Sequence, residues 1–278
     1  MPAINFHHEY KPTIANPYLF DETYLTVPPA LQLQPYIRCF WGSKKNFNPH
    51  NSSVYKNMLI IPDTCFDLLF IKNNGTGKFK IIFTGINDSF VFDQWDEQDN
   101  DISIFAIRFQ FWTLSLICRY PMAGTLNKLI PPQEVFPHIS ELCEQIFEKT
   151  SFKDKIWLAG EYLKTLLSPG NVYEPFFNGT DFILKHKGVG TLSQLSEHLS
   201  YSERQVQRIF LNQLGITPKH FMNLVRYQAL WQEILSLKSV NYMDLVCKYG
   251  YTDQSHLIGD FKRYHSMTPQ EACRLFPI

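Results

Sequence analysis

The sequence predicts an α+β protein: an antiparallel β domain with a helical annex, then an all-α domain in which a long helix joins two helix-turn-helix units. Its 278 residues are enough for two hydrophobic cores. Short β-branched and aromatic runs dominate up to about Trp112, and helical periodicity replaces them after Pro137. Charge divides the chain in the same way, because residues 176–278 hold 11 Lys and Arg against 8 Asp and Glu, and residues 1–175 hold 15 against 18. Only the C-terminal part has the basic surplus that favours nucleic acid.

The first domain is predicted to consist of strands. The segments rich in strand-forming residues are 58–72, 78–86, 89–95 and 101–111. Between them, Asn73–Gly75 and Ile86–Ser89 have the composition of hairpin turns with positive φ. We therefore expect a meandering antiparallel sheet or a small barrel.

A helical annex is predicted to follow the strands. Apolar residues recur there every three to four positions, at Ile156, Ala159, Leu163, Leu166 and Leu167. We expect a homodimer held through the helices between Pro137 and Leu167, because Ile156, Leu163 and Leu167 give this segment an apolar stripe; the alternative is that the stripe packs on its own sheet. The segment 168–179 then contains two prolines and two glycines, which indicates a boundary between domains 1–170 and 171–278.

The second domain carries explicit helix-capping signals, and about seven helices fit into it. Three segments match a capping box, namely Thr191–Gln194, Ser202–Gln205 and Thr268–Glu271, and Thr217-Pro218 puts proline at the first helical position. Gly215 and Gly250 stand where helices must end.

One pattern occurs twice among these helices: a short helix, a tight turn and a second helix opened by a hydroxyl cap. Such a pattern predicts a helix-turn-helix, whose second helix enters the major groove of DNA. In the first unit, Val206, Ile209 and Phe210 form an inner apolar face. The outer face offers long hydrogen-bonding side chains to base edges, and these are Arg204, Gln207 and Arg208.

The second unit has a weaker set of groups for reading bases. Leu257 and Phe261 face inward. The opening turn carries Gln254, Ser255 and His256, while Lys262 and Arg263 lie near the level of the phosphates. Because Gly259 offers no side chain to the groove, we expect the first unit to read bases and the second mainly to fix position, through Lys262, Arg263 and its helix N-terminus.

The helix between the two units is predicted to run from Pro218 to about Leu237. Twenty residues at 1.5 Å give a length of about 30 Å. One turn of B-DNA is about 34 Å, so a rigid helix of this length sets two recognition helices into successive major-groove segments.

These residues resemble the AraC/XylS family of transcription regulators. The likeness rests on S-x-R-x-V-x-R-x-F at 202–210, G-I-T-P at 215–218, Arg226 with Ala229, and G-Y-T-D-Q-S-H-x-x-x-x-F-K-R at 250–263 followed by Thr268-Pro269. It implies a regulator that binds double-stranded DNA and acts with RNA polymerase, and both activation and repression of transcription stay open. The chain departs from the family pattern at Val246, Gly259 and Ser266.

The first domain is similar to the cupin-like sensor module of some of these regulators. The matching pieces are 35–37 leading to Trp41, 61–63 with 67–70, and 107–109. The likeness implies a small-molecule effector, and the candidate pocket residues are Tyr36, Trp41, Phe66, Asp67 and Arg108. The alternatives are that the aromatic residues are core and that Arg108 forms an internal ion pair with Asp63 or Asp67, which we favour.

Other functions find little support in the sequence. His7-His8 and His50 lack metal-ligand spacing, the six cysteines form no CxxC pair, and residues 1–175 hold no recognisable catalytic grouping, so we expect no enzyme, metal or cofactor. Neither a secretion signal nor an apolar run long enough for a membrane is present, which predicts a cytoplasmic protein. Two alternatives stay open: a regulator controlled by a protein partner or its own abundance, favoured by a closed, dry β interior, and a DNA-directed enzyme with chemistry in the β domain.

Overall fold

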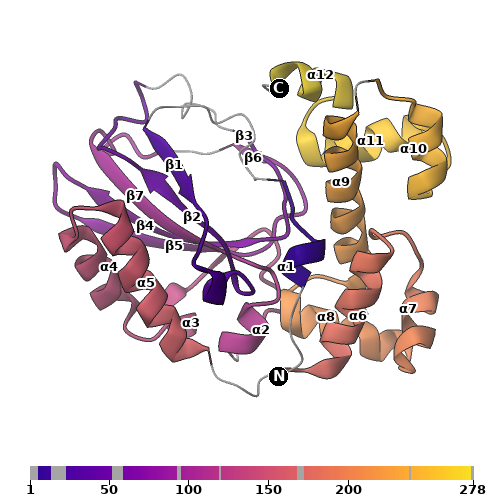
Figure 1. Cartoon of the computed structure of the whole chain (residues 1–278), viewed down its shortest axis with the longest axis horizontal. Helices are drawn as coiled ribbons and strands as arrows, with labels where there is room; N and C mark the ends of the chain where they lie inside the picture. The colour runs from indigo at the N-terminus through magenta and orange to yellow at the C-terminus, as the bar shows by residue number, and fades with distance from the viewer. Residues whose placement is uncertain are drawn as a thin grey trace.

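The structure is a computed structural model that describes residues 6–13, 23–51, 59–92, 95–118, 120–167, 172–237 and 239–276. Figure 1 shows a β domain and a helical domain side by side. The predicted boundary at residues 170 and 171 lies outside the described residues. The chain folds as α+β, with the sheet first and the helical region after it.

The β domain is built on one six-stranded antiparallel sheet. Its order is β1-β2-β7-β4-β5-β8, and β3 pairs with β6 in a separate two-stranded sheet. The strands are β1 (Tyr24–Val27), β2 (Ile37–Ser43), β3 (Leu59–Ile60), β4 (Phe66–Asn73), β5 (Phe79–Thr84), β6 (Val91–Phe92), β7 (Ile102–Phe109) and β8 (Leu129–Ile130). The prediction of a meander was wrong, because β7 lies between β2 and β4 and pairs with both.

The two predicted hairpin turns have different outcomes. Asn73–Gly75 does connect the paired strands β4 and β5, although the positive φ falls on Gly77. Ile86–Ser89 was wrongly predicted as a hairpin turn, because it leads from β5 into β6, which belongs to the other sheet. None of its four residues has a positive φ.

Phenylalanine rings fill the interior of the β domain. The six that lie on described strands and are fully buried are Phe40, Phe66, Phe70, Phe83, Phe105 and Phe109. Phe66 and Phe83 stack with ring centroids 6.0 Å apart, and Phe40 and Phe105 lie at the same separation. The rings thus fill the space between strands and annex, as in a close-packed core.

The helical annex covers one face of this sheet (Figure 1). It consists of α3 (Pro132–Val135), α4 (Ile139–Glu148) and α5 (Phe152–Leu166). Ring pairs join it to the strands, Phe83 to Phe136 at 5.0 Å and Phe105 to Phe152 at 5.2 Å. Along the predicted apolar stripe, Ala159 and Leu163 are buried in this contact, and Ile156, Leu166 and Leu167 pack against its edge. The stripe therefore packs on its own domain.

The second domain contains seven described helices. They are α6 (Glu174–Lys185), α7 (Leu192–Leu199), α8 (Glu203–Leu214), α9 (Pro218–Ser236), α10 (Tyr242–Tyr249), α11 (Gln254–His265) and α12 (Pro269–Leu275). The three predicted capping boxes form with both of their hydrogen bonds, and Gly215 and Gly250 end their helices in the left-handed conformation.

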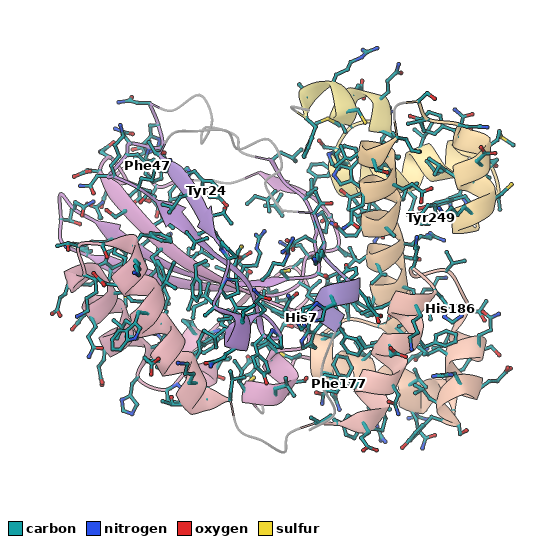
Figure 2. All side chains as sticks on the ribbon, viewed as in Figure 1. His7, Tyr24, Phe47, Phe177, His186 and Tyr249 are labelled. Atoms are coloured by element: carbon teal, nitrogen blue, oxygen red, sulfur yellow. The ribbon has the colours of Figure 1, made fainter. Side chains whose placement is uncertain are left out.

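The seam between the two domains is closely packed. The short helix α1 (Phe6–Glu9) lies in it, with the ring of Phe6 5.4 Å from that of Trp112 and 6.2 Å from that of Phe177. Figure 2 shows His7 of α1 and Phe177 of α6 near each other there. Gln228 of α9 is fully buried, and its side chain donates to Pro62 O and accepts from Thr13 N, both at 2.7 Å. Hydrogen bonds as well as ring contacts therefore join the domains.

Candidate nucleic-acid interface

The first helix-turn-helix unit presents a free polar face. Its turn passes through Ser200, which adopts the left-handed conformation, and Ser202 caps α8 by accepting from Gln205 N. Val206, Ile209 and Phe210 are buried, as predicted. Arg204, Gln207 and Arg208 are all exposed and make no ion pair or side-chain hydrogen bond within the described part of the chain. These three side chains are available to a partner.

The second unit has the same geometry with other groups at its helix start. Gly250 makes the left-handed turn, and the N-cap of α11 is Asp253, whose carboxylate accepts from His256 N at 2.8 Å. The predicted hydroxyl cap was wrong here, because Thr252 instead hydrogen-bonds the ring of His256 at 2.9 Å. The Asp253 carboxylate thus binds one of the backbone amides at the N-terminus of α11, which we expected to bind a DNA phosphate.

The two recognition helices can be compared position by position. Both have twelve residues and begin directly after their caps, Ser202 and Asp253. The positions of Arg204, Gln207 and Arg208 in α8 correspond to Ser255, Ile258 and Gly259 in α11. Gln254, Ser255 and His256 are exposed, as is Lys262. Of the second-unit residues predicted to contact DNA, only Ser255 therefore occupies a position equivalent to one of the three residues predicted to contact bases in α8.

The long helix α9 is clamped to the second unit by polar contacts. Arg226 binds Asp260 of α11 at 3.1 Å and stacks on the ring of Tyr251, whose hydroxyl also donates to Asp260. Glu233 accepts from Lys248 and from the Tyr249 hydroxyl, each at 2.7 Å, and Tyr249 lies between α9 and α10 (Figure 2). Partial burial raises the pKa of Glu233, but these two hydrogen bonds and the Lys248 charge outweigh it and lower the pKa. The carboxylate therefore stays ionised.

The first unit is held to the same helix by apolar packing. The ring of Phe221 in α9 lies 5.9 Å from that of Phe210 in α8. Leu214 of α8 and Leu224 of α9 are fully buried in the same hydrophobic core. The helix is nineteen residues long, so its length is about 28 Å at 1.5 Å per residue. The predicted span of Pro218 to about Leu237 agrees with the structure to within a residue.

One cation of the second unit is bound to the β domain. Arg263 of α11 forms an ion pair with Asp88 at 3.2 Å, and the two side chains are 46% and 16% exposed. Asp88 is fixed in turn by Asn127, which donates to its carboxylate at 2.8 Å. The sequence gives no signal for this contact, because the two residues are 175 positions apart.

The predicted effector-pocket residues are largely engaged with one another. Arg108 pairs with Asp63 at 3.1 Å and with Asp67 at 2.7 Å, and the Trp41 indole donates to Asp67 at 2.9 Å. Burial lowers the pKa of Arg108, but the two carboxylates outweigh it and hold the pKa well above its usual range. Phe66 is fully buried, whereas Tyr36 packs at the edge of the core. Arg108 thus forms the internal ion pair that we favoured, with both candidate partners.

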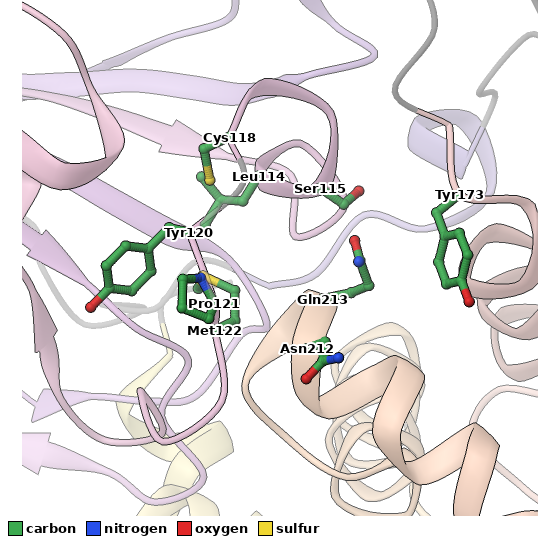
Figure 3. Close-up of a pocket in the computed structure, with 9 residues that line it drawn as sticks. All are labelled: Leu114, Ser115, Cys118, Tyr120, Pro121, Met122, Tyr173, Asn212 and Gln213. Carbon is green, nitrogen blue, oxygen red and sulfur yellow. The ribbon is translucent and has the colours of Figure 1, made fainter.

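One cavity adjoins these groups, and a separate cleft lies at the seam between the domains. The cavity, of about 70 Å³, is bounded by Arg108, Asp63, Arg38, Cys39, Thr26 and Pro12, and it has room for a few water molecules. The cleft is larger, about 430 Å³ (Figure 3). Its walls are Leu114, Ser115, Cys118, Tyr120, Pro121 and Met122 from the first domain and Tyr173, Asn212 and Gln213 from the second. Sequence reasoning missed this cleft, because its walls are far apart in the chain.

Two further observations concern metals and membranes. Among the residues with a described position, no three His, Cys, Asp or Glu side chains are grouped to hold a metal ion. None of the described helices combines the length and the hydropathy of a membrane span.

Comparisons with known proteins match this geometry. A family model described as a helix-turn-helix domain matches residues 195–274, and another, described as a domain of unknown function, matches residues 25–131. The transcriptional regulatory protein HptR of Staphylococcus aureus is 29% identical over 84 residues, which are 30% of this chain and 32% of HptR. The chain thus aligns with about a third of the length of the curated relatives it matches.

Solved structures are similar as well. The C-terminal domain of AraT, a response regulator from Geobacillus stearothermophilus, is 24% identical, covering 40% of this chain and 89% of its own, with a TM-score of 0.35. ToxT from Vibrio cholerae is 11% identical, covering 86% of this chain and 99% of its own, with a TM-score of 0.43. The residues matched by the helix-turn-helix family model include most of α7 and all of α8, α9, α10 and α11, and so the chain carries a helix-turn-helix domain at residues 195–274. The residues on which the resemblance to the AraC/XylS family rests lie within this segment.

Proposed function

We propose that the protein is a sequence-specific DNA-binding regulator of transcription. The observation that carries this proposal is the outer face of α8, where Arg204, Gln207 and Arg208 are exposed and unpaired among the described residues. Arginine pairs with guanine and glutamine with adenine in the major groove. Three such side chains on a capped helix, whose opposite face is buried, form a surface suited to base edges.

The spacing of the two units supports the same function. A helix of about 28 Å, fixed to both units, sets α8 and α11 close to one helical turn of DNA apart. A single duplex can then accept both recognition helices on one face. We further propose that the protein acts in the cytoplasm with RNA polymerase as its partner, because a regulator of transcription has to act on this enzyme.

The test is selection of binding sites from a pool of random duplexes, followed by titration of the selected site. We expect the wild type to enrich one sequence and the Arg204→Ala/Arg208→Ala variant to lose that preference. Arg274→Ala is the matched control, because it removes an exposed cation from α12, outside both recognition helices. A wild type that enriches no sequence would refute the proposal.

Control by a small molecule is a second part of the proposal. The phenylalanine core and the paired Arg108 cluster leave little room inside the β domain, which favours control by a protein partner, by abundance or by a ligand at its edge. Six of the nine residues around the 430 Å³ cleft belong to the first domain, and clefts between domains are frequent ligand sites. We therefore place the effector candidate in this cleft.

We propose no catalytic role for the β domain, because its clustered ionisable groups, Asp63, Asp67 and Arg108, are used by one another. Helix-turn-helix regulators are in general not enzymes. A homodimer remains a proposal. On α5, Trp157 is 64% exposed although its neighbours pack inward. Light scattering of the wild type and of Trp157→Lys at high micromolar concentration tests whether two copies of the chain associate through this face.

A further inference from the structure

Two loops of the β domain form one hydrogen-bonded platform, which we define as residues 85–89 and 121–128. Asn127 N donates to Ile86 O and Gly85 N to Lys128 O, both at 2.9 Å. Asp88 N donates to Asn127 Oδ1 at 3.0 Å, and Asn127 Nδ2 donates back to the Asp88 carboxylate at 2.8 Å. The Asp88 side chain is therefore fixed before any partner reaches it.

The platform contacts both recognition helices. Met122 N donates to Asn212 O of α8 at 3.3 Å, and a Cβ added at Gly215 would lie only 2.5 Å from Met122 O. At the other helix, Asp88 binds Arg263 of α11 at 3.2 Å. Asn212 and Arg263 are both the tenth residues of their twelve-residue helices. The β domain thus holds the two units at equivalent points.

The position of Arg263 on α11 indicates how its ion pair with Asp88 affects DNA binding. Ser255, Gly259 and Arg263 are four residues apart and form one stripe on the exposed face, opposite the buried Leu257 and Phe261. Ser255 and Arg263 are eight positions apart, which is about 12 Å along the helix, and the major groove is about 12 Å wide. With Ser255 at the bases, Arg263 reaches the phosphates at the edge of the groove.

A carboxylate and a phosphate bind a guanidinium in the same way, through charge-assisted hydrogen bonds. From this geometry we infer that Asp88 is an internal competitor of DNA phosphate at Arg263, so that the second unit engages DNA fully only when the β domain gives up this ion pair. The inference rests on the proposed DNA-binding function. Asp88 is a positioning residue, because it touches Arg263 and not DNA.

The cleft between the domains offers a way for a bound molecule to control this ion pair. Pro121 and Met122 belong both to the platform and to the wall of the 430 Å³ cleft in Figure 3. A molecule bound in the cleft would therefore act on the loop that supports Asp88. Displacement of this loop releases Arg263 for phosphate.

The test is a double-mutant cycle on DNA binding with four full-length proteins: wild type, Asp88→Asn, Arg263→Ala and the double variant. Asparagine keeps the shape of Asp88 and its hydrogen bonds with Asn127 but loses the charge. Asp96→Asn is the matched control, because Asp96 has an exposed ion pair with Lys80 inside the β domain and the substitution changes the net charge equally. Each protein is titrated with a random-sequence duplex at several salt concentrations, and circular dichroism confirms the fold.

We expect Asp88→Asn to bind about two- to fivefold more tightly than Asp96→Asn, the range for an exposed ion pair, with a steeper salt dependence by about one released counterion. In the Arg263→Ala background, Asp88→Asn should have no effect beyond that of Asp96→Asn. Equal affinities of Asp88→Asn and Asp96→Asn, or a gain that persists without Arg263, would overturn the inference and leave the proposed function standing. Absence of binding in all of the proteins would overturn both.

Discussion

The two helix-turn-helix units have nearly the same backbone and very different outer faces. Each has a left-handed turn, a capped twelve-residue recognition helix and a buried apolar face. In the first unit the outer positions hold Arg204, Gln207 and Arg208; in the second the equivalent positions hold a serine, an isoleucine and a glycine. Buried residues and caps determine the fold, whereas the exposed positions determine whether a unit can read bases.

The units also differ in how they are fastened. Apolar packing joins the first to α9, with the rings of Phe210 and Phe221 in contact. The second is fixed to α9 by Arg226 and Glu233 and to the β domain by Asp88. The ion pairs with α9 give the second unit a defined position beside the first, which suits a role in placing the protein on DNA, whereas the pair with Asp88 has to be released for full DNA binding.

The largest expected effect comes from breaking the clamp on the second unit. Arg226 and Asp260 are only 16% and 12% exposed, so Arg226→Met leaves a carboxylate with little solvent and one remaining donor, Tyr251. We expect a loss of about 3 kcal/mol in the free energy of unfolding. Hydrogen exchange should rise in α10 and α11 and stay unchanged in α7 and α8. Equal increases of hydrogen exchange in both units would contradict the view that ion pairs hold the second unit to α9 and apolar packing holds the first.

The next effect concerns base reading by the first unit. Arg208→Ala should weaken binding to the specific site by about 1 to 3 kcal/mol and change binding to random DNA little, because a base-edge contact is lost. Lys262→Ala in the second unit is the matched comparison, since a phosphate contact is lost equally on all sequences. Fluorescence anisotropy with both duplexes measures the two losses. Equal losses for Arg208→Ala on specific and random DNA would mean that Arg208 touches only phosphate.

A buried histidine makes the second unit sensitive to acid. His265 stands at the position of Leu214 in the first unit, is fully buried, and shares a hydrogen bond with the Tyr227 hydroxyl. Burial lowers the pKa of His265 to about 3. The unfolded chain takes up the proton at about pH 6.5, so stability is complete above this pH and decreases towards pH 3, by about 1.4 kcal/mol at pH 5.5.

The variant His265→Leu tests this pH dependence, since it gives the second unit the residue of the first. Urea unfolding at pH 7.5 and pH 5.5 should show a smaller loss of stability for the variant than for the wild type. Identical losses in the two proteins would show that His265 is not responsible.

The smallest expected effect is at Gly259. A Cβ added there meets nothing within 4 Å, and glycine inside a helix costs about 1 kcal/mol relative to alanine. Gly259→Arg also gives α11 the residue that α8 has at its equivalent position, Arg208. We expect it to tighten binding on most sequences and to add a guanine preference in the second half-site. A marked loss of affinity, with an unchanged circular dichroism spectrum, would mean that DNA approaches the glycine too closely for a side chain.

The sequence predicts the helical domain better than the β domain, and the reason is physical. Helix ends depend on neighbours three or four residues away, so the capping boxes and the stops at Gly215 and Gly250 can be read from short segments. The pairing of β7 with both β2 and β4 depends on distant segments, and for this reason the meander was a wrong prediction.

The difference between local and long-range contacts also decides which parts of the candidate sites can be predicted from the sequence. The pairing of Arg108 with Asp63 and Asp67 is predictable, because a charged side chain inside an apolar sheet requires partners. The Asp88–Arg263 ion pair and the cleft at the seam are not, because two domains must first dock to create them. The cap of α11 was missed for a smaller reason: Thr252 and Asp253 are adjacent, both can cap a helix, and the structure uses the aspartate.

The different roles of the two helix-turn-helix units are measured by the information content of each half of the selected binding site. The wild-type protein is used to enrich duplexes from a random pool, and base preferences are scored at every position. We expect one half-site with sharp preferences, abolished by Arg204→Ala/Arg208→Ala, and a second half-site, about one helical turn away, with weak preferences. Equally sharp preferences in both half-sites, or a sharp half-site that survives the loss of both arginines, would contradict these roles.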